Sequence, residues 1–240
     1  MGANIGIIGA QGHLGQSLTR KLEKIKPASV NIIGTTDKDH NPEIAAQSDL
    51  LVICVRPQHV ASLLSEIRDS LKKDAQILSF AAGVAIKDME KASGRPAARA
   101  MADPWWQFAG FVFGENFSKN NYEFIFDKLT NKIIPLAGES DIDEFTAYFV
   151  HAYIALFLKA SNLLPTAREH LEYLAPHLNS SIDELENCLP TGDPEELLRK
   201  LATPGGVTEA VLQAIQNDAG ISPAAAHSAG IERLHNISIS

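Results

Sequence analysis

Ile5-Gly6-Ile7-Ile8-Gly9-Ala10-Gln11-Gly12-His13-Leu14-Gly15 is the stretch that decides the fold. A short apolar strand runs into glycines at 9, 12 and 15, and a helical pattern of apolar residues follows. Gly9 allows a sharp turn, Gly12 leaves room for phosphates against the backbone, and Gly15 lets the helix pack on the strand. The amides at the start of that helix would face an anion. We therefore predict a dinucleotide-binding turn of the form G-x-x-G-x-x-G rather than an ordinary strand-to-helix turn.

Length, charge and cysteine content narrow the function classes. The 240 residues can form one large domain or two modest ones. The net charge of -8 argues against a nucleic-acid partner, which requires a basic face. Cys54 and Cys188 give no disulfide framework, so a reducing, cytoplasmic location is expected. The N-terminal apolar run is interpreted as a strand rather than a leader, and residues 145–158 are too short an apolar stretch to span a bilayer.

The two halves of the chain have different patterns. In the first half, strands are expected near 30–34, 49–55, 76–80, 96–101 and 108–113, alternating with helices near 14–24, 58–71 and 86–92. Such repetition predicts a parallel sheet with helices on both faces. A capping box at Ser140 and Asp143 would begin a long helix reaching Leu164, with further helices after it. The prediction is a Rossmann-type NAD(P)-binding domain over 1–138 and an all-helical substrate and dimerisation domain over 139–240.

Three later segments complete the predicted cofactor site. Thr35 and Thr36 end the second strand where NAD-preferring sites carry an acid, so NADP(H) is predicted, with NAD(H) as the alternative. Asp37 would oppose a 2′-phosphate if it pointed inward. Arg56 either flanks the cofactor or is an exposed charge at a strand end. The small residues after the fourth strand would admit the nicotinamide ribose, a plain loop being the alternative. The predicted contacts are Gly9, Gln11, Gly12, His13, Leu14, Gly15, Thr35, Thr36, Val55, Arg56, Pro57, Ala81, Ala82, Gly83 and Asp103.

The order and spacing of these landmarks resemble the pyrroline-5-carboxylate reductase family over most of the chain. That family's glycine turn, A-V-K-P, S-I-A-A-G, R-x-M-P-N and S-P-G-G-T-T match the turn at 9–15, then 54–57, 79–83, 99–103 and 203–208. The resemblance implies a homodimeric NADP(H)-dependent reductase of a small cyclic imine carboxylate, pyrroline-5-carboxylate to proline, in proline biosynthesis. No metal and no dedicated general acid are expected, because a protonated imine is already electrophilic.

The loop at 203–208 is the predicted substrate site. Pro204 stiffens it, and two glycines expose backbone amides just before a helix, which suits a carboxylate. On these residues alone, an ordinary capped helix start fits equally well. The resemblance implies that Gly205, Gly206, Val207 and Thr208 bind the substrate, with Thr208 as the catalytic residue near the ring nitrogen.

Departures from the family pattern, and two other functions, complete the expectations. Asp103 replaces an asparagine, Trp105 and Trp106 follow it, and Tyr148 and His151 replace small residues of the long helix. His151 is more readily explained as structural than as a proton donor. The apolar surface of residues 145–158, which extends nearly all round the expected helix, predicts a homodimer through the helical domain.

One alternative function is a β-hydroxyacid dehydrogenase acting on a 3-hydroxy acid, with Lys159 and Asn162 on one helix face. The other is a dinucleotide-binding protein without catalysis, used as a sensor or scaffold.

Overall fold

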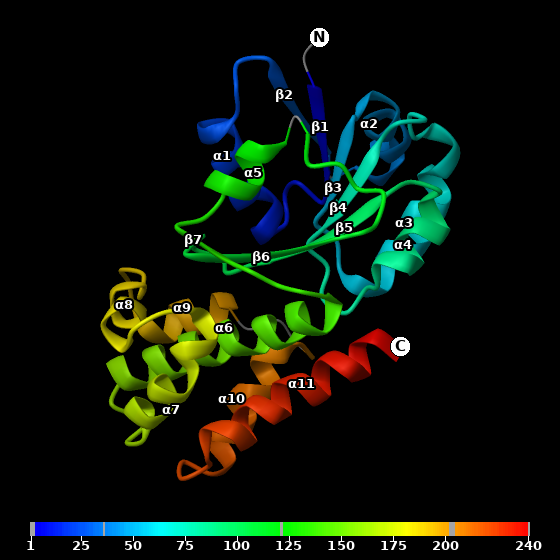
Figure 1. Ribbon diagram of the computed structural model, residues 1–240. Helices are drawn as coiled ribbons and strands as arrows, with labels where there is room; N and C mark the ends of the chain where they lie inside the picture. Colours follow the sequence, from blue (N-terminus) through cyan, green and yellow to red (C-terminus); the bar gives the residue numbers. More distant parts are fainter. Residues whose placement is uncertain (1–2, 36, 121, 202–204, 240) are drawn as a thin grey trace. The chain divides into compact units, whose positions relative to one another are not determined.

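The computed structural model describes residues 3–35, 37–120, 122–201 and 205–239. The chain divides into two compact units, Met1–Ile142 and Asp143–Ser240 (Figure 1). The boundary expected between residues 138 and 139 lies just before this division. The roles assigned to the two domains stay predictions.

The described part of the first unit is built on a seven-stranded sheet of order β2-β1-β3-β4-β5-β6-β7. Pairing is parallel from β2 through β5, antiparallel between β5 and β6, and parallel between β6 and β7. The expected all-parallel sheet is therefore wrong at β6, because the connection over 103–107 is a tight turn, and a parallel pairing needs a long crossover. The strands are β1 (Ala3–Ile8), β2 (Val30–Thr35), β3 (Leu50–Ile53), β4 (Gln76–Ser79), β5 (Ala97–Ala102), β6 (Phe108–Phe113) and β7 (Lys132–Ile134).

Helices cover both faces of this sheet, with α1 and α5 on one side and α2, α3 and α4 on the other (Figure 1). The expected helix at 58–71 is divided into a 3-10 turn, α3 and a second 3-10 turn, and the apolar stripe of α3 is buried. Short α2, α5 and β7 lacked a periodic signal in the sequence. The elements are α1 (His13–Ile25), η1 (Lys38–His40), α2 (Asn41–Gln47), η2 (Pro57–His59), α3 (Val60–Ile67), η3 (Arg68–Ser70), α4 (Ile86–Ser93) and α5 (Glu123–Lys128).

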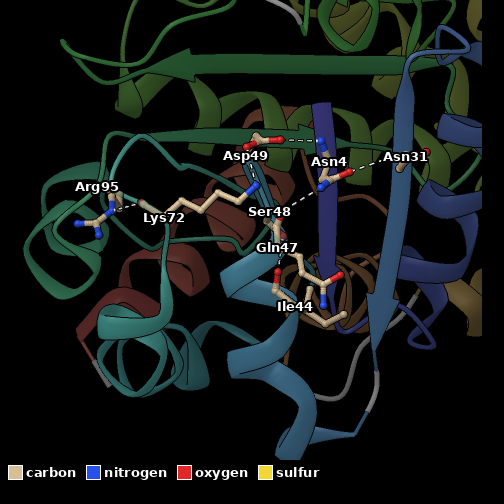
Figure 2. A network of polar contacts seen from close by, with 8 residues as sticks. All are labelled: Asn4, Asn31, Ile44, Gln47, Ser48, Asp49, Lys72 and Arg95. Carbon is tan, nitrogen blue, oxygen red and sulfur yellow. Dashed lines mark hydrogen bonds and ion pairs between the residues drawn. The ribbon is translucent and has the colours of Figure 1, made fainter. Parts of the chain in front are cut away.

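A polar network ties together the amino ends of β1, β2 and β3 (Figure 2). The Asp49 carboxylate accepts from the Asn4 backbone N–H and from Lys72 Nζ, each at 2.8 Å. Asn31 Nδ2 donates to the Asn4 side-chain oxygen at 3.1 Å, and Arg95 Nε donates to the Lys72 carbonyl at 2.7 Å. These bonds fix the strand register at the amino ends of the strands. The predicted cofactor contacts lie at the opposite, carboxyl ends.

The described residues of the second unit are helical throughout their regular structure. α6 ends at Ala160 rather than Leu164. It begins at Glu139, so Ser140 lies within its first turn rather than at its N-cap, and the capping box expected there is wrong. A capping box does begin α8, from Ser181 to Glu184. The elements are α6 (Glu139–Ala160), α7 (Ala167–Leu174), η4 (Pro176–Leu178), α8 (Ile182–Asn187), α9 (Pro194–Leu201), α10 (Val207–Asn217) and α11 (Pro223–Ile239).

The apolar surface of α6 is covered within the single chain. Residues 145–158 are buried except for the half-buried Tyr148, and Leu163 is the one exposed large apolar side chain among the described residues. The apolar side chains that motivated the homodimer prediction are therefore already buried in the single chain, and the dimer stays a prediction. In the part of the chain that the structure describes, no helix is long and apolar enough to cross a membrane.

Candidate functional site

The ends of four parallel strands lie at one level of the sheet. Ile8 pairs with Thr35 on one side and with Ile53 on the other, and Ile53 pairs with Ser79. Because β2 and β3 flank β1, the chain switches direction here, and open α/β sheets bind ligands at such a point. The loops that leave this edge carry the predicted contacts at 9–15, 55–57 and 81–83.

Two of the three motif glycines are required by the fold itself. Gly9 has φ +86°, and a Cβ there would lie 2.7 Å from the Cys54 carbonyl oxygen. A Cβ on Gly15 would lie 2.1 Å from the Gly9 oxygen. Gly12 differs, since its φ of −63° and ψ of 162° suit any residue and its Cβ would come no closer than 3.4 Å to the chain. The fold alone does not require glycine at 12, which fits an approach by a ligand.

The start of α1 is open to an anion. Gly12 is its N-cap, with no side-chain cap and no acidic residue in the first turn. The first amides of a helix have no partner within it, so those from His13 onward can face negative charge. Gln16 Nε2 donates to the Gln11 carbonyl at 2.7 Å and steadies the turn, and the Gln11 and His13 side chains are exposed. Leu14 is half-buried.

The loops after β3 and β4 supply a cation and small residues. Arg56 is exposed and lies between the half-buried Val55 and Pro57. Among the described residues its guanidinium forms no ion pair. After β4, the buried Ser79 Oγ accepts from the Ala81 N–H at 3.2 Å. Gly83 follows with φ +70°, and Ala82 is half-buried. The chain therefore carries no large side chain at 81–83, beside the switch point.

The residues that bear on NADP against NAD are only partly described. Thr36 lies outside the described residues, and for Thr35 only the backbone is described, at the end of β2. Asp37 is engaged in its own turn: one carboxylate oxygen accepts from the Asp39 N–H at 3.1 Å, and the other pairs with His40 Nδ1 at 3.1 Å. The preference for NADP(H) over NAD(H) therefore stays a prediction.

Asp103 holds the turn between β5 and β6. Its carboxylate is fully buried and accepts from the backbone N–H groups of Trp105, Gln107 and Phe108 at 2.6–2.9 Å. The side chain thus stabilises the β5–β6 turn, and its contact with a cofactor stays a prediction. Trp106, which closes this turn at φ 60°, is also a core residue, and its Nε1 donates to Ser17 Oγ of α1 at 2.7 Å.

The predicted substrate loop begins outside the described residues, which omit Thr203 and Pro204. Gly205 is described and has φ +70°. Its N–H donates to a carboxylate oxygen of Glu209, and its carbonyl accepts from Arg233 Nε, both at 2.5 Å. Gly206 is the N-cap of α10 and receives no side-chain cap. Neither Glu209 nor Arg233 was among the predicted site residues, although a glutamate at the third helical position is a local capping signal.

Thr208 and Val207 are turned into the helical unit. Thr208 is 6% exposed, and its Oγ1 donates to the Leu201 carbonyl at 3.2 Å. Val207 is 7% exposed. The hydroxyl is thus bonded within the chain in this conformation, and the catalytic role of Thr208 stays a prediction.

The helical unit also contains a cluster of imidazole and phenol rings that the sequence did not reveal. His151 Nε2 and His170 Nδ1 are 2.7 Å apart, with both rings fully buried. Tyr148 lies between His177 and His227, each ring centroid 4.0 Å away and nearly parallel. Burial lowers the pKa of His151 to about 3, with smaller effects of His170 and His227. A neutral His151 agrees with the structural role expected for it.

The dehydrogenase alternative loses its geometric basis. Lys159 forms an ion pair with Glu186, and Asn162, with φ 56°, lies beyond the end of α6. The two residues therefore do not share a helix face. The described residues also contain no group of three or more His, Cys, Asp or Glu side chains that could hold a metal ion.

Comparisons with known proteins agree with this arrangement. The family model described as "NADP oxidoreductase coenzyme F420-dependent" matches residues 4–83. A curated Bacillus subtilis protein named pyrroline-5-carboxylate reductase 2 is 28% identical over 75% of this chain and 68% of its own length. A pyrroline-5-carboxylate reductase of Methanobrevibacter smithii is 26% identical over 86% of this chain and 94% of its own. Together these matches support an oxidoreductase.

Solved structures show the same fold. Pyrroline-5-carboxylate reductase from Coxiella burnetii has a TM-score of 0.62 at 20% identity, covering 99% of both chains. The Plasmodium falciparum enzyme, solved with NADP bound, has a TM-score of 0.60 at 18% identity over 98% of both. A 3-hydroxyisobutyrate dehydrogenase from Mycobacterium tuberculosis reaches 0.54 at 12% identity, covering 100% of this chain and 95% of its own. The predicted Rossmann-type fold followed by helices is confirmed, and so is the resemblance drawn from the sequence.

Proposed function

We propose that this chain, a divergent member of the pyrroline-5-carboxylate reductase family, transfers a hydride from NADPH to a small cyclic imine. The proposal rests on the turn at Gly12. The start of α1 is uncapped there, and the fold itself does not require a glycine at this position. The NADP-bound Plasmodium falciparum relative supports NADP(H), and NAD(H) is the alternative.

The chain's residues would bind and orient rather than perform acid–base chemistry. The nicotinamide supplies the hydride. The amides that follow Gly12 would hold the diphosphate, and the backbone at 81–83 would lie against the nicotinamide ribose. A protonated imine needs no further activation, so holding its carbon in reach and excluding water are the chain's main contributions.

Three finer points belong to the same proposal. The names of the relatives supply pyrroline-5-carboxylate as the reference substrate, with proline as product and proline biosynthesis as the setting. The resemblance supports a homodimer through the helical unit. The two cysteines without a disulfide fit a cytoplasmic location.

The test compares two glycine-to-valine variants. Gly12→Val places a branched side chain where the phosphates would lie, while Gly138→Val adds one where no atom lies within 4 Å. NADPH and NADH are titrated by fluorescence, and imine reduction is followed by loss of NADPH absorbance. We expect Gly12→Val alone to lose NADPH binding while keeping the thermal midpoint of the wild type.

Unchanged NADPH affinity in Gly12→Val would contradict the cofactor site. NADPH binding without reduction of any cyclic imine would favour the non-catalytic sensor or scaffold over the reductase.

A further inference from the structure

Trp106 has a backbone conformation that a bulky residue does not favour. Its φ of 60° lies in the left-handed region, where a large side chain is strained and a glycine is not. The conformation is fixed from both sides, since the Trp106 N–H donates to the Asp103 carbonyl at 3.1 Å and its carbonyl accepts from the Asn131 N–H at 3.2 Å. A glycine would make this turn without strain, so the turn itself does not account for a tryptophan. Strain of this kind concentrates near functional sites.

The indole ring of Trp106 is bonded to α1. The residue is 6% exposed, and its Nε1 donates to Ser17 Oγ at 2.7 Å. Ser17 lies one turn after His13, the first residue of α1. A phenylalanine could fill the same apolar space, but it has no donor for the serine hydroxyl. The bond therefore ties the β5–β6 turn to the helix whose first amides would hold the diphosphate.

The same ring also packs against the start of the loop after β4. Phe80 is the first residue after that strand and is 5% exposed, and its ring meets the Trp106 ring edge-on, with centroids 6.2 Å apart and planes at 84°. The Phe80 N–H donates to the Ile53 carbonyl at 3.0 Å, which holds its backbone to β3. Residues 81–83, predicted to lie against the nicotinamide ribose, follow directly. One side chain thus contacts both α1 and the residue that leads into 81–83.

We propose that Trp106 is a positioning residue for the dinucleotide, which fixes the start of α1 relative to the loop at 80–83 before the cofactor binds. This inference rests on the proposed cofactor site at Gly12. The Gln16 N–H donates to the Gly12 carbonyl at 2.9 Å, so the amides at 13–15 precede the hydrogen-bonded helix and are the ones that can face an anion. Amides that are already in place avoid the entropy cost of ordering them when the ligand binds.

Four single variants separate positioning from stability. Trp106→Phe removes the donor and keeps a ring against Phe80, while Ser17→Ala removes the acceptor, and the two changes are also combined. Trp105→Phe makes the same chemical change at the half-buried neighbouring residue. Met89→Ala lowers stability on the other face of the sheet, where the buried Met89 belongs to α4. The thermal midpoint is measured for each, and the NADPH dissociation constant is measured far below that midpoint.

Trp106→Phe and Ser17→Ala should each weaken NADPH binding about threefold to tenfold, the effect of one lost hydrogen bond. The double variant should bind no more weakly than either single variant, because both changes remove the same bond. Trp105→Phe and Met89→Ala should keep the wild-type affinity, although Met89→Ala lowers the midpoint. In imine reduction, Trp106→Phe should raise the KM for NADPH and leave kcat unchanged, because a ring remains against Phe80.

Wild-type NADPH affinity in Trp106→Phe would overturn the proposal, and so would effects of Trp106→Phe and Ser17→Ala that add in the double variant. A loss of affinity in Met89→Ala equal to that in Trp106→Phe would overturn it too, because stability alone would then explain both. If NADPH binds but no imine is reduced, the reductase function fails, and the dissociation constants still decide the role of Trp106.

An NMR measurement without cofactor keeps the inference separate from the cofactor site. In Trp106→Phe, the amide signals of Gly12 and Gly15 should show added motion in relaxation measurements, while that of Gly94, at the end of α4, should not. A wild type that binds neither NADPH nor NADH contradicts the cofactor site. In that case, Gly12 and Gly15 signals that Trp106→Phe leaves unchanged overturn the positioning role as well.

Discussion

Acidification should destabilise the helical unit, Asp143–Ser240, before the first unit, Met1–Ile142. His151 and His170, whose fully buried rings bond to each other, lie in the helical unit, whereas His13, His40 and His59 of the first unit are exposed. A buried neutral imidazole must stay neutral while its unfolded counterpart gains a proton. Stability is therefore lost as pH falls below the ordinary histidine pKa.

The geometry explains why His151 resists a proton. Its Nε2 bonds to His170, its Nδ1 has no hydrogen-bond partner among the described residues, and both rings are fully buried. The second proton of an imidazolium would therefore be buried without an acceptor. The neighbouring titratable groups are Glu144 and Tyr148 of α6, His170, Tyr173 and Glu169 of α7, His177 of η4, and His227 of α11.

The magnitude follows from the pKa difference. The pKa of His151 is about 3 in the folded chain against 6.5 for an ordinary histidine. Between pH 7 and pH 5 the unfolded chain gains this proton and the folded chain does not, which costs about 2 kcal/mol of unfolding free energy. Burial also lowers the pKa of His170, so its contribution has the same sign. The loss would continue toward pH 3.

Denaturant unfolding at pH 7 and pH 5 measures this loss. Both tryptophans lie in the first unit, so their emission reports on it, while near-UV tyrosine dichroism follows mainly the helical unit. His151→Gln should remove about 2 kcal/mol of the pH dependence, with His59→Gln at an exposed site as the matched control. A wild-type stability of the helical unit that stays flat from pH 7 to pH 5 would refute the reasoning. So would an NMR titration of His151 near its ordinary pKa.

Three substitutions test the first unit. Gly15→Ala should lower the thermal midpoint by well over the roughly 2–4 °C that about 1 kcal/mol causes in a chain of this size, since its Cβ would lie 2.1 Å from the Gly9 oxygen. A midpoint within a degree or two of wild type would contradict this close approach. Asp103→Asn should cost about 1–3 kcal/mol in denaturant unfolding without changing NADPH affinity, because one acceptor oxygen replaces two that serve three N–H groups; an unchanged stability with weaker NADPH binding would support its predicted cofactor role. Lys72→Met should cost about 1 kcal/mol or less, since the pair with Asp49 is partly exposed, and the difference should shrink in high salt.

The parts of the fold that local pattern determines could be predicted from the sequence. α1 and β6 match the predicted segments because each has a clear apolar period and a flanking turn signal. The strand-end loops were predicted for the same reason, since parallel strands place their carboxyl ends together. The antiparallel direction of β6 was not, because it depends on a buried Asp103 that holds the turn over 103–107.

Features that depend on distant pairing were out of reach. His151 of α6 bonds to His170 of α7, and Tyr148 stacks on rings from η4 and α11. Because these residues come from separate elements, no local spacing in the sequence predicts the cluster. Arg233 reaches Gly205 from a helix 28 residues away in sequence. Glu209 is the exception, because its place in the first turn of α10 was visible in the sequence.

The residues that depart from the family pattern are largely bonded or stacked inside their own unit. Tyr148 stacks between two imidazoles, His151 bonds to His170, and Asp103 holds a turn. Gly12, by contrast, has a conformation that suits any residue, so the fold itself does not require glycine there. A residue type that the fold does not explain is a candidate for contact with a ligand, and of the three motif glycines only Gly12 meets this criterion. The predicted cofactor contacts thus carry the stronger functional signal, whereas Tyr148 and His151 of the helical unit make contacts within that unit.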